Sequence, residues 1–135
     1  MLNYLNKYLK NFKLLVSLWA LFIFILISIP TSNILQMPKF IDLLQPDKIV
    51  HLFIYTVFVF LLYKAFIQST FVLSQTNINL IVFLIGVIYS GASELLQKYV
   101  FTYRQCSIYD FTADIIGCFL GLLIIKLTNK ITFFI

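Results

Sequence analysis

Charged residues are scarce in this sequence, and their scarcity excludes a water-soluble domain. Only 11% of the 135 residues are charged, while 61% are hydrophobic and the mean hydropathy is +0.99. A soluble domain of this length needs polar side chains over its whole outside, and ten basic with five acidic residues are too few. We therefore expect membrane lipids to cover most of the surface and to be the chain's main partners.

Cysteine is scarce too, which argues against a disulfide framework. Cys106 and Cys118 are the only two cysteines, and a helix would place them roughly 18 Å apart at 1.5 Å per residue. Neither has a second cysteine or a histidine at metal-ligand spacing, so the sequence predicts no metal and no cofactor. The basic residues lie scattered between apolar runs without forming a stripe, so nucleic acid is not a predicted partner.

Apolar stretches of membrane-spanning length occur four times. They run over about 14–30, 49–67, 78–97 and 108–127, and about 20 residues suffice to cross the hydrocarbon core. Short connectors join them, so we predict an all-α, polytopic integral membrane protein, an antiparallel bundle of about four transmembrane helices forming one domain over 1–135. Residues 1–13 carry leucines opposite lysines at helical spacing, which predicts an interfacial segment. No small-x-small cleavage site follows, so we expect an uncleaved anchor.

The distribution of lysines predicts the orientation. With both termini in the cytoplasm, the cytoplasmic side collects only basic residues, namely Lys7, Lys10, Lys13, Lys64, Lys126 and Lys130. The outer side then collects every acidic residue, the only histidine and the only arginine, together with Lys39, Lys48 and Lys98. Ionisable chemistry is thereby predicted at a single face of the membrane.

Polar and small residues follow one stripe on each predicted helix, because positions three or four apart share a face. We expect these stripes to face one another and to form a ligand-binding or functional polar cluster, without assigned catalytic residues. The predicted cluster comprises Asp47, Lys48, His51, Glu94, Gln97, Arg104, Asp110 and Asp114, and the stripes add Tyr55, Ser90 and Ser93. Gly86, Gly117 and Gly121 are predicted helix-packing positions.

Ordinary helix-end roles compete with a functional reading for part of this set. Asp47 follows Pro46 where a carboxylate favours the positive end of a helix dipole, and Ser107 to Asp110 has the form of a capping box. His51 could be a satisfied interfacial residue. Glu94 and Asp114 fit such roles poorly, because a carboxylate inside the membrane needs a partner. Arg104 is the first candidate for it, since its guanidinium can bind a carboxylate in a bidentate manner.

These residues also carry a resemblance to a known family. Asp47-Lys48-x-x-His51, Glu94-x-x-Gln97, Arg104-x-x-Ser107-x-x-Asp110 and Gly117-x-x-x-Gly121, within about 37–122, resemble the VanZ-like family of bacterial membrane proteins. Asp114 departs from the pattern, because the family usually has asparagine there. The resemblance implies a multi-pass protein of the bacterial cytoplasmic (inner) membrane, acting in the cell envelope, with a role in antibiotic resistance to glycopeptides such as teicoplanin.

Three functions remain open on this basis. The first is binding, or modulating access to, an amphipathic envelope ligand: a lipid-linked cell-wall precursor, an anionic lipid or a glycopeptide antibiotic. The second is an intramembrane hydrolase or transferase on a lipid headgroup, with His51 or Glu94 as general base and a metal held by carboxylates. The third, a proton-coupled transporter, needs ionisable groups throughout the membrane rather than at one face. No oligomeric state follows from the sequence.

Overall fold

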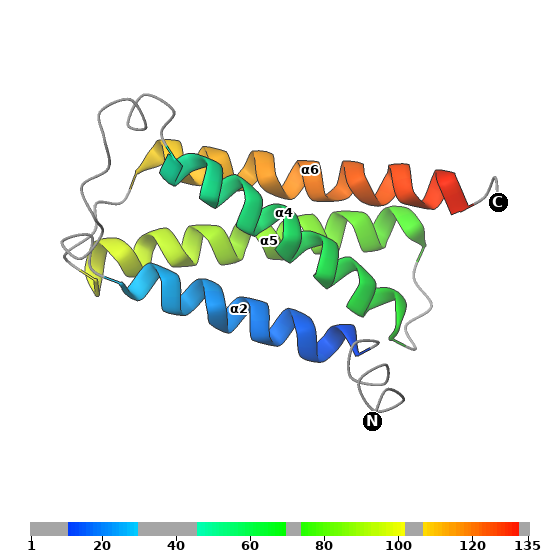
Figure 1. Cartoon of the computed structure of the whole chain (residues 1–135), viewed down its shortest axis with the longest axis horizontal. Helices are drawn as coiled ribbons and strands as arrows, with labels where there is room; N and C mark the ends of the chain where they lie inside the picture. Colours follow the sequence, from blue (N-terminus) through cyan, green and yellow to red (C-terminus); the bar gives the residue numbers. More distant parts are fainter. Residues whose placement is uncertain (1–10, 30–45, 70–73, 102–106, 133–135) are drawn as a thin grey trace.

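The fold is a bundle of helices whose neighbours in sequence run in opposite directions (Figure 1). The computed structural model describes residues 11–29, 46–69, 74–101 and 107–132. Over these ranges it has four helices, α2 (Phe12–Ser28), α4 (Pro46–Ile67), α5 (Gln75–Tyr99) and α6 (Ile108–Thr132), and no strand. The predicted all-α antiparallel bundle is therefore confirmed.

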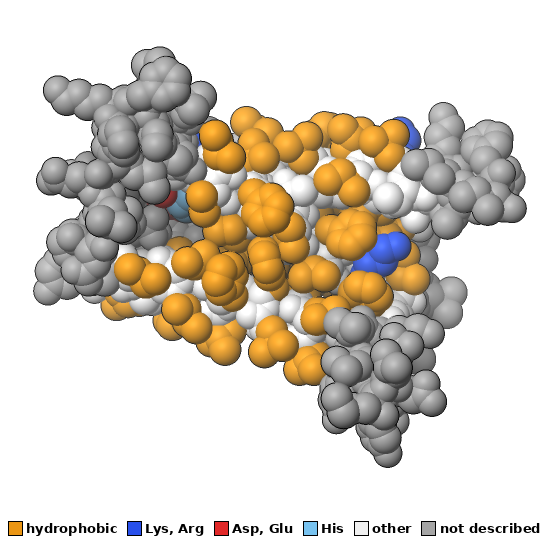
Figure 2. All heavy atoms as spheres, in the orientation of Figure 1, with side chains coloured by type: hydrophobic (Ala, Val, Ile, Leu, Met, Phe, Trp, Pro, Cys, Tyr) orange, Lys and Arg blue, Asp and Glu red, His pale blue; other side chains and the backbone are white. Residues whose placement is uncertain are grey.

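Three of these helices are long and apolar enough to cross a membrane, α4, α5 and α6. The fourth, α2, is equally apolar, but its 17 residues extend about 25 Å at 1.5 Å per residue, the lower end of the spanning range. Hydrophobic side chains cover the flank of the bundle (Figure 2), and Phe53, Ile88 and Phe119 are each more than half exposed. A surface this apolar is stable in the hydrocarbon core of a membrane and not in water, so the chain is a membrane protein.

Three of the described helices, α2, α4 and α5, begin before their apolar stretches, whereas α6 begins at Ile108 as predicted. α4 begins at Pro46 and α5 at Gln75, whereas hydropathy placed the predicted spans at 49 and 78. Local capping explains the difference for α5, because the Ser74 side chain accepts a hydrogen bond from the Asn77 amide. The first turn of α4 carries Asp47. A charged residue lowers the hydropathy and so falls outside the predicted span, but a carboxylate is favourable in the first turn of a helix.

Close packing joins α4 to α6, the most extensive helix contact in the bundle. A Cβ added at Gly117 would overlap the Leu52 carbonyl oxygen, and one at Gly121 would lie 2.8 Å from the Thr56 carbonyl oxygen. The Thr56 hydroxyl donates to the Gly117 carbonyl oxygen at 3.1 Å. Glycine at both positions therefore lets the two backbones touch.

The other helices complete the core around α4. Gly86 of α5 faces Cys118 and Val59, where an added Cβ would lie within 2.9 Å of both side chains. α2 is tied to the bundle by two long-range hydrogen bonds, from Trp19 Nε1 to the Ile54 carbonyl and from the Tyr89 hydroxyl to the Ala20 carbonyl. These bonds satisfy polar groups that hydrocarbon could not.

The two ends of the bundle differ in charge. We call the end where α4 and α6 begin and α5 ends the site end, and the other the lysine end (Figure 1). Lys13, Lys64 and Lys126 mark the lysine end, whereas every described acidic residue lies toward the site end. The predicted interfacial segment up to residue 10, Lys39 and Arg104 lie outside the described residues.

Candidate functional site

Three helix ends bring the predicted polar residues together. α4 and α6 begin where α5 ends, so the first two turns of α4 and α6 lie beside the last two turns of α5 (Figure 1). Five polar residues are all buried there, and four of them are Asp, Glu or Gln, types that are mostly exposed in proteins: His51, Glu94, Gln97, Asp110 and Asp114. Antiparallel topology thus gathers polar residues separated by more than 60 positions in the sequence.

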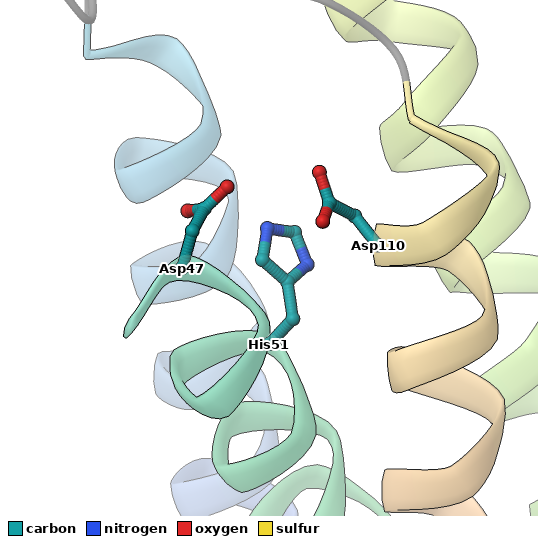
Figure 3. Close-up of side chains that lie close together, drawn as sticks. All are labelled: Asp47, His51 and Asp110. Atoms are coloured by element: carbon teal, nitrogen blue, oxygen red, sulfur yellow. The ribbon is translucent and has the colours of Figure 1, made fainter. Parts of the chain in front are cut away.

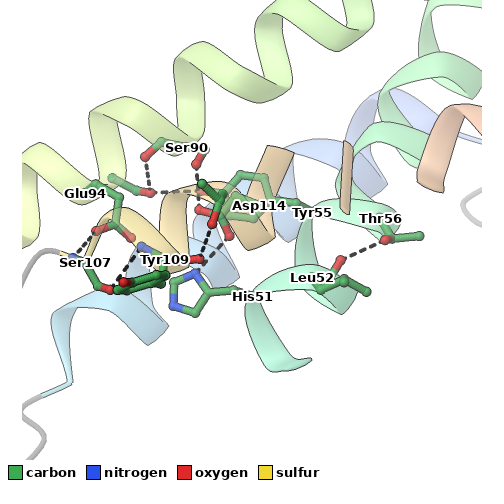
Figure 4. A network of polar contacts seen from close by, with 11 residues as sticks. His51, Leu52, Tyr55, Thr56, Ser90, Glu94, Ser107, Tyr109 and Asp114 are labelled. Atoms are coloured by element: carbon green, nitrogen blue, oxygen red, sulfur yellow. Dashed lines mark hydrogen bonds and ion pairs between the residues drawn. The ribbon is translucent and has the colours of Figure 1, made fainter. Parts of the chain in front are cut away.

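Asp114 is the centre of the resulting network (Figure 4). Its side chain is fully buried, and one carboxylate oxygen lies 2.9 Å from His51 Nδ1. The other carboxylate oxygen accepts a hydrogen bond from the Ser90 hydroxyl at 2.6 Å. Both oxygens are therefore engaged, which offsets the cost of placing this group inside the bundle.

A chain of hydroxyl groups continues the network on α5. Ser93 Oγ donates to the Ser90 carbonyl oxygen at 2.7 Å and lies 2.9 Å from the Tyr55 hydroxyl. Since the Ser93 proton is used in the first bond, the Tyr55 hydroxyl donates in the second. The chain links α4 to α5 beneath Asp114 and leaves its members fully buried or nearly so.

Glu94 accepts a hydrogen bond from the Ser107 backbone amide at 3.2 Å. That amide is the group that a capping box would pair with Asp110. The predicted reciprocal box is therefore wrong, although its first half is present, because the Ser107 hydroxyl accepts from the Tyr109 amide at 3.2 Å. Glu94, on α5, thus accepts the hydrogen bond that Asp110 would accept in a capping box. The Asp110 carboxylate does not pair with this amide.

His51 faces two further carboxylates with its other nitrogen. Because Nδ1 pairs with Asp114, Nε2 is the nitrogen that points toward the space between Asp47 and Asp110 (Figure 3). One ligand atom from each of Asp47, His51 and Asp110 lies within 4.8 Å of the others. A second group with the same spacing, His51, Glu94 and Asp114, lies deeper and is buried throughout.

Gln97 brings an amide to the same end of α5. It is only 2% exposed, and its Nε2 has no hydrogen-bond partner among the residues that the structure describes. A buried amide donor without a partner costs of the order of 1–3 kcal/mol. Such a group is well suited to donate to a ligand that enters this end of the bundle.

Cationic residues flank the cluster. Lys48 Nζ lies 4.7 Å from the centre of the Tyr109 ring, and Lys98 Nζ lies 5.4 Å from that of the neighbouring Tyr99. Arg104, the predicted partner of the buried carboxylates, lies outside the described residues. Within them Asp114 pairs with His51 and Ser90, and Glu94 with a backbone amide.

Sequence reasoning missed several members of this network. Ser90, Ser93 and Tyr55 lay on the predicted stripes but were not assigned to the site. A usable signal existed for Ser90 and Tyr55, which lie four positions from Glu94 and His51 and so share their helix faces. The pairing of the Ser107 amide with Glu94 joins two helices through a backbone group, and no side-chain pattern could reveal it.

The arrangement is a buried polar cluster at one end of an apolar bundle, with acceptor oxygens, an imidazole nitrogen and an amide donor. Such a set can bind hydroxyl, amide and cationic groups, and it can orient an imidazole for proton transfer. Comparison with protein-family models, with curated proteins and with solved structures finds no match for this chain.

Proposed function

We propose that this chain is a VanZ-like bacterial envelope protein that binds the polar headgroup of an amphipathic ligand at the site end. The observation that carries the proposal is the buried polar cluster that includes Gln97 Nε2, a donor without a partner among the described residues. The resemblance of Asp47-Lys48-x-x-His51 and Glu94-x-x-Gln97 to the family supports it. So does the apolar flank, which lets a lipid tail lie beside the bundle while its headgroup enters the cluster.

The proposal includes an orientation in the bacterial cytoplasmic membrane. Lysines favour the cytoplasmic side of membrane proteins, and the lysine end holds Lys13, Lys64 and Lys126 without a described acidic residue. The site end then faces outward, and both termini lie in the cytoplasm. Lipid-linked wall precursors and glycopeptides meet the membrane on that outer side.

The chemistry of the cluster favours a lipid-linked wall precursor among the envelope ligands. The carboxylates accept hydrogen bonds from sugar hydroxyls and peptide amides, and Gln97 donates to a carbonyl. Lys48 at the rim supplies a cation for phosphate. An anionic lipid offers fewer hydroxyl and amide groups for these contacts than such a precursor does.

Native mass spectrometry of gently purified protein tests this proposal. We expect a co-purified phosphorylated isoprenoid lipid on the unaltered chain and its loss from Gln97→Met, which removes the amide at nearly constant volume. The variant should melt no lower in detergent, because it removes a buried unpaired donor. Gln75→Met is the matched control, since Gln75 lies at the lysine end and donates to the Tyr63 hydroxyl.

Three results would contradict the proposal. They are the absence of any bound envelope lipid, retention of that lipid by Gln97→Met, or its equal loss from Gln75→Met. A tightly bound glycopeptide with no lipid would replace the proposed ligand by the antibiotic. Susceptibility to teicoplanin in a deletion strain, complemented by the unaltered chain or by Gln97→Met, tests the proposed role in glycopeptide resistance.

A second function is favoured by one observation, the pairing of His51 with Asp114 at 2.9 Å. A buried carboxylate that holds one imidazole nitrogen leaves the other available as a general base. The chain would then hydrolyse or transfer a group on a lipid headgroup. Time-dependent release of phosphate or of a sugar from a lipid-linked precursor, lost in His51→Gln, would favour catalysis over binding.

A further inference from the structure

We propose that Asp47, His51 and Asp110 form a binding site for a divalent transition-metal cation, with Zn²⁺ as the best-fitting ion. The site would lie at the mouth of the polar cluster, formed by the first two turns of α4 and the first turn of α6 (Figure 3). The proposal is independent of any headgroup ligand.

His51 is the central group of the proposed site, because its side chain is buried and only one of its two ring nitrogens has a hydrogen-bond partner among the described residues. The His51 side chain is 10% exposed, and Nδ1 is engaged by Asp114. Its Nε2 has no hydrogen bond to any residue that the structure describes. That nitrogen points between the carboxylates of Asp47 and Asp110 (Figure 3), and one ring nitrogen of His51 lies within 4.8 Å of a carboxylate oxygen of each.

Asp110 is the second buried group at this site. It is 9% exposed, and the amide expected to pair with it in a capping box donates to Glu94 instead. No hydrogen bond joins its carboxylate to another described residue. Two carboxylates beside an imidazole nitrogen concentrate negative charge, which a divalent cation would neutralise.

Asp114 fixes the orientation of the His51 imidazole. Ligand histidines commonly donate their second ring N–H to a carboxylate, which fixes the tautomer and the direction of the metal-binding nitrogen. The 2.9 Å contact between His51 Nδ1 and Asp114 supplies that arrangement. Asp114 is thus a positioning residue, and Ser90 positions it in turn through the second oxygen.

The donor set selects the type of ion. One nitrogen and two carboxylate oxygens suit Zn²⁺ or Mn²⁺ better than Mg²⁺ or Ca²⁺, which prefer oxygen alone. Donors of a tetrahedral Zn²⁺ site lie about 3.4 Å apart, at about 2.1 Å from the ion. The three groups would have to close by the order of 1 Å, and the exposed first-turn position of Asp47 permits that movement. A fourth position would remain open for water or a headgroup oxygen.

The deeper group of His51, Glu94 and Asp114 is the weaker site. Both Asp114 oxygens already have partners, and one Glu94 oxygen accepts from the Ser107 amide. A cation there would also have to displace His51 Nδ1 from Asp114, or turn the ring. Substitutions of Asp47, Asp110 and Glu94 therefore separate the two sites.

Titration calorimetry on the full chain tests the inference. The protein, purified in detergent without a histidine tag and stripped with EDTA, would be titrated with Zn²⁺ at pH 7.5. We expect one equivalent to bind, and Asp47→Asn, Asp110→Asn and His51→Gln each to weaken binding at least tenfold. Glu94→Gln should change it by less than threefold, and millimolar Mg²⁺ should not compete.

The elution volume and the helical circular dichroism signal of each variant show whether it is folded. Asp47→Asn carries the decision if the buried variants fail to fold, because Asp47 is exposed. The inference is overturned if the unaltered chain binds no Zn²⁺, or if Glu94→Gln abolishes binding while Asp47→Asn does not. Retention of the co-purified lipid by Asp47→Asn without Zn²⁺ would separate the metal site from the proposed headgroup site.

Discussion

Two buried tyrosines on α4, Tyr55 and Tyr63, face opposite ends of the bundle and very different surroundings. Tyr55 belongs to the site end, where its hydroxyl meets Ser93 beneath the buried Asp114. Tyr63 belongs to the lysine end, where its hydroxyl accepts hydrogen bonds from Gln75 and Asn129. One helix therefore anchors two polar networks, an ionisable one and a neutral one.

The difference between the networks lies in burial and not in the number of bonds. Gln75 and Asn129 are exposed, so water or lipid headgroups can replace Tyr63 as their partner. Ser90, Ser93 and Asp114 are buried, so each of them depends on the others. A polar network that excludes water is costly to break and is suited to specific recognition, whereas an exposed one contributes mainly to solvation.

The strongest test of this comparison asks whether the two ends face opposite sides of the membrane. We expect a cysteine introduced at Lys39 to be labelled by an impermeant maleimide in intact cells and one at Lys130 to be protected, since lysines favour the cytoplasm. Cys106 would be replaced by serine, whereas Cys118 can stay because it is buried. Labelling at Lys130 but not at Lys39 would invert the orientation and place the site inside.

The next largest effect is expected from Asp114→Ala. The change leaves His51 and Ser90 without their acceptor in a buried region, and we expect the free energy of unfolding to fall by about 3 kcal/mol. Asn129→Ala at the lysine end should cost about 1 kcal/mol or less, since its partner Tyr63 keeps Gln75. Unfolding by sodium dodecyl sulfate in mixed micelles measures both. Equal losses would show that the ends do not differ in the way we describe.

Gly117→Ala should act through the helix contact that holds the site together. An added Cβ would overlap the Leu52 carbonyl, next to His51, so we expect a loss of about 2 kcal/mol as α4 and α6 separate. Gly91→Ala is the matched control, because its Cβ would lie 3.6 Å from Phe111 and meet no backbone. That control should be neutral, or stabilising by about 0.5 kcal/mol. A neutral Gly117→Ala would contradict the close packing of these helices.

The smallest effects are expected from the two tyrosines themselves. Tyr55→Phe should cost about 1 kcal/mol, because it removes a donor from the buried Ser93. Tyr63→Phe should cost about 0.5 kcal/mol or less, because the exposed amides of Gln75 and Asn129 can find other partners. Thermal melting in detergent compares the pair, and a larger loss from Tyr63→Phe would reverse our assignment of the sensitive end.

Hydropathy and helical spacing predicted much of the fold and part of the cluster. Long apolar stretches specify helices without reference to other parts of the chain, so all four described helices fall where the stretches lie. The gathering of His51, Glu94 and Asp114 was also predictable, because antiparallel neighbours place alternate helix ends together. The capping box was wrong because Ser107 is within reach of another helix, which no local pattern records.

The sequence by itself determined that lipid surrounds the chain and where its helices lie. It also determined that the acidic residues lie at the opposite helix ends from most lysines. Each of these properties depends only on local composition. What only the tertiary structure decided was which partner each buried group takes. His51 pairs with Asp114 across 63 positions, and that pairing directs Nε2 toward Asp47 and Asp110. The physical reason is that hydrogen bonds act over about 3 Å, so a pairing follows from how α4 and α6 pack, through Gly117 and Gly121, and not from either segment alone.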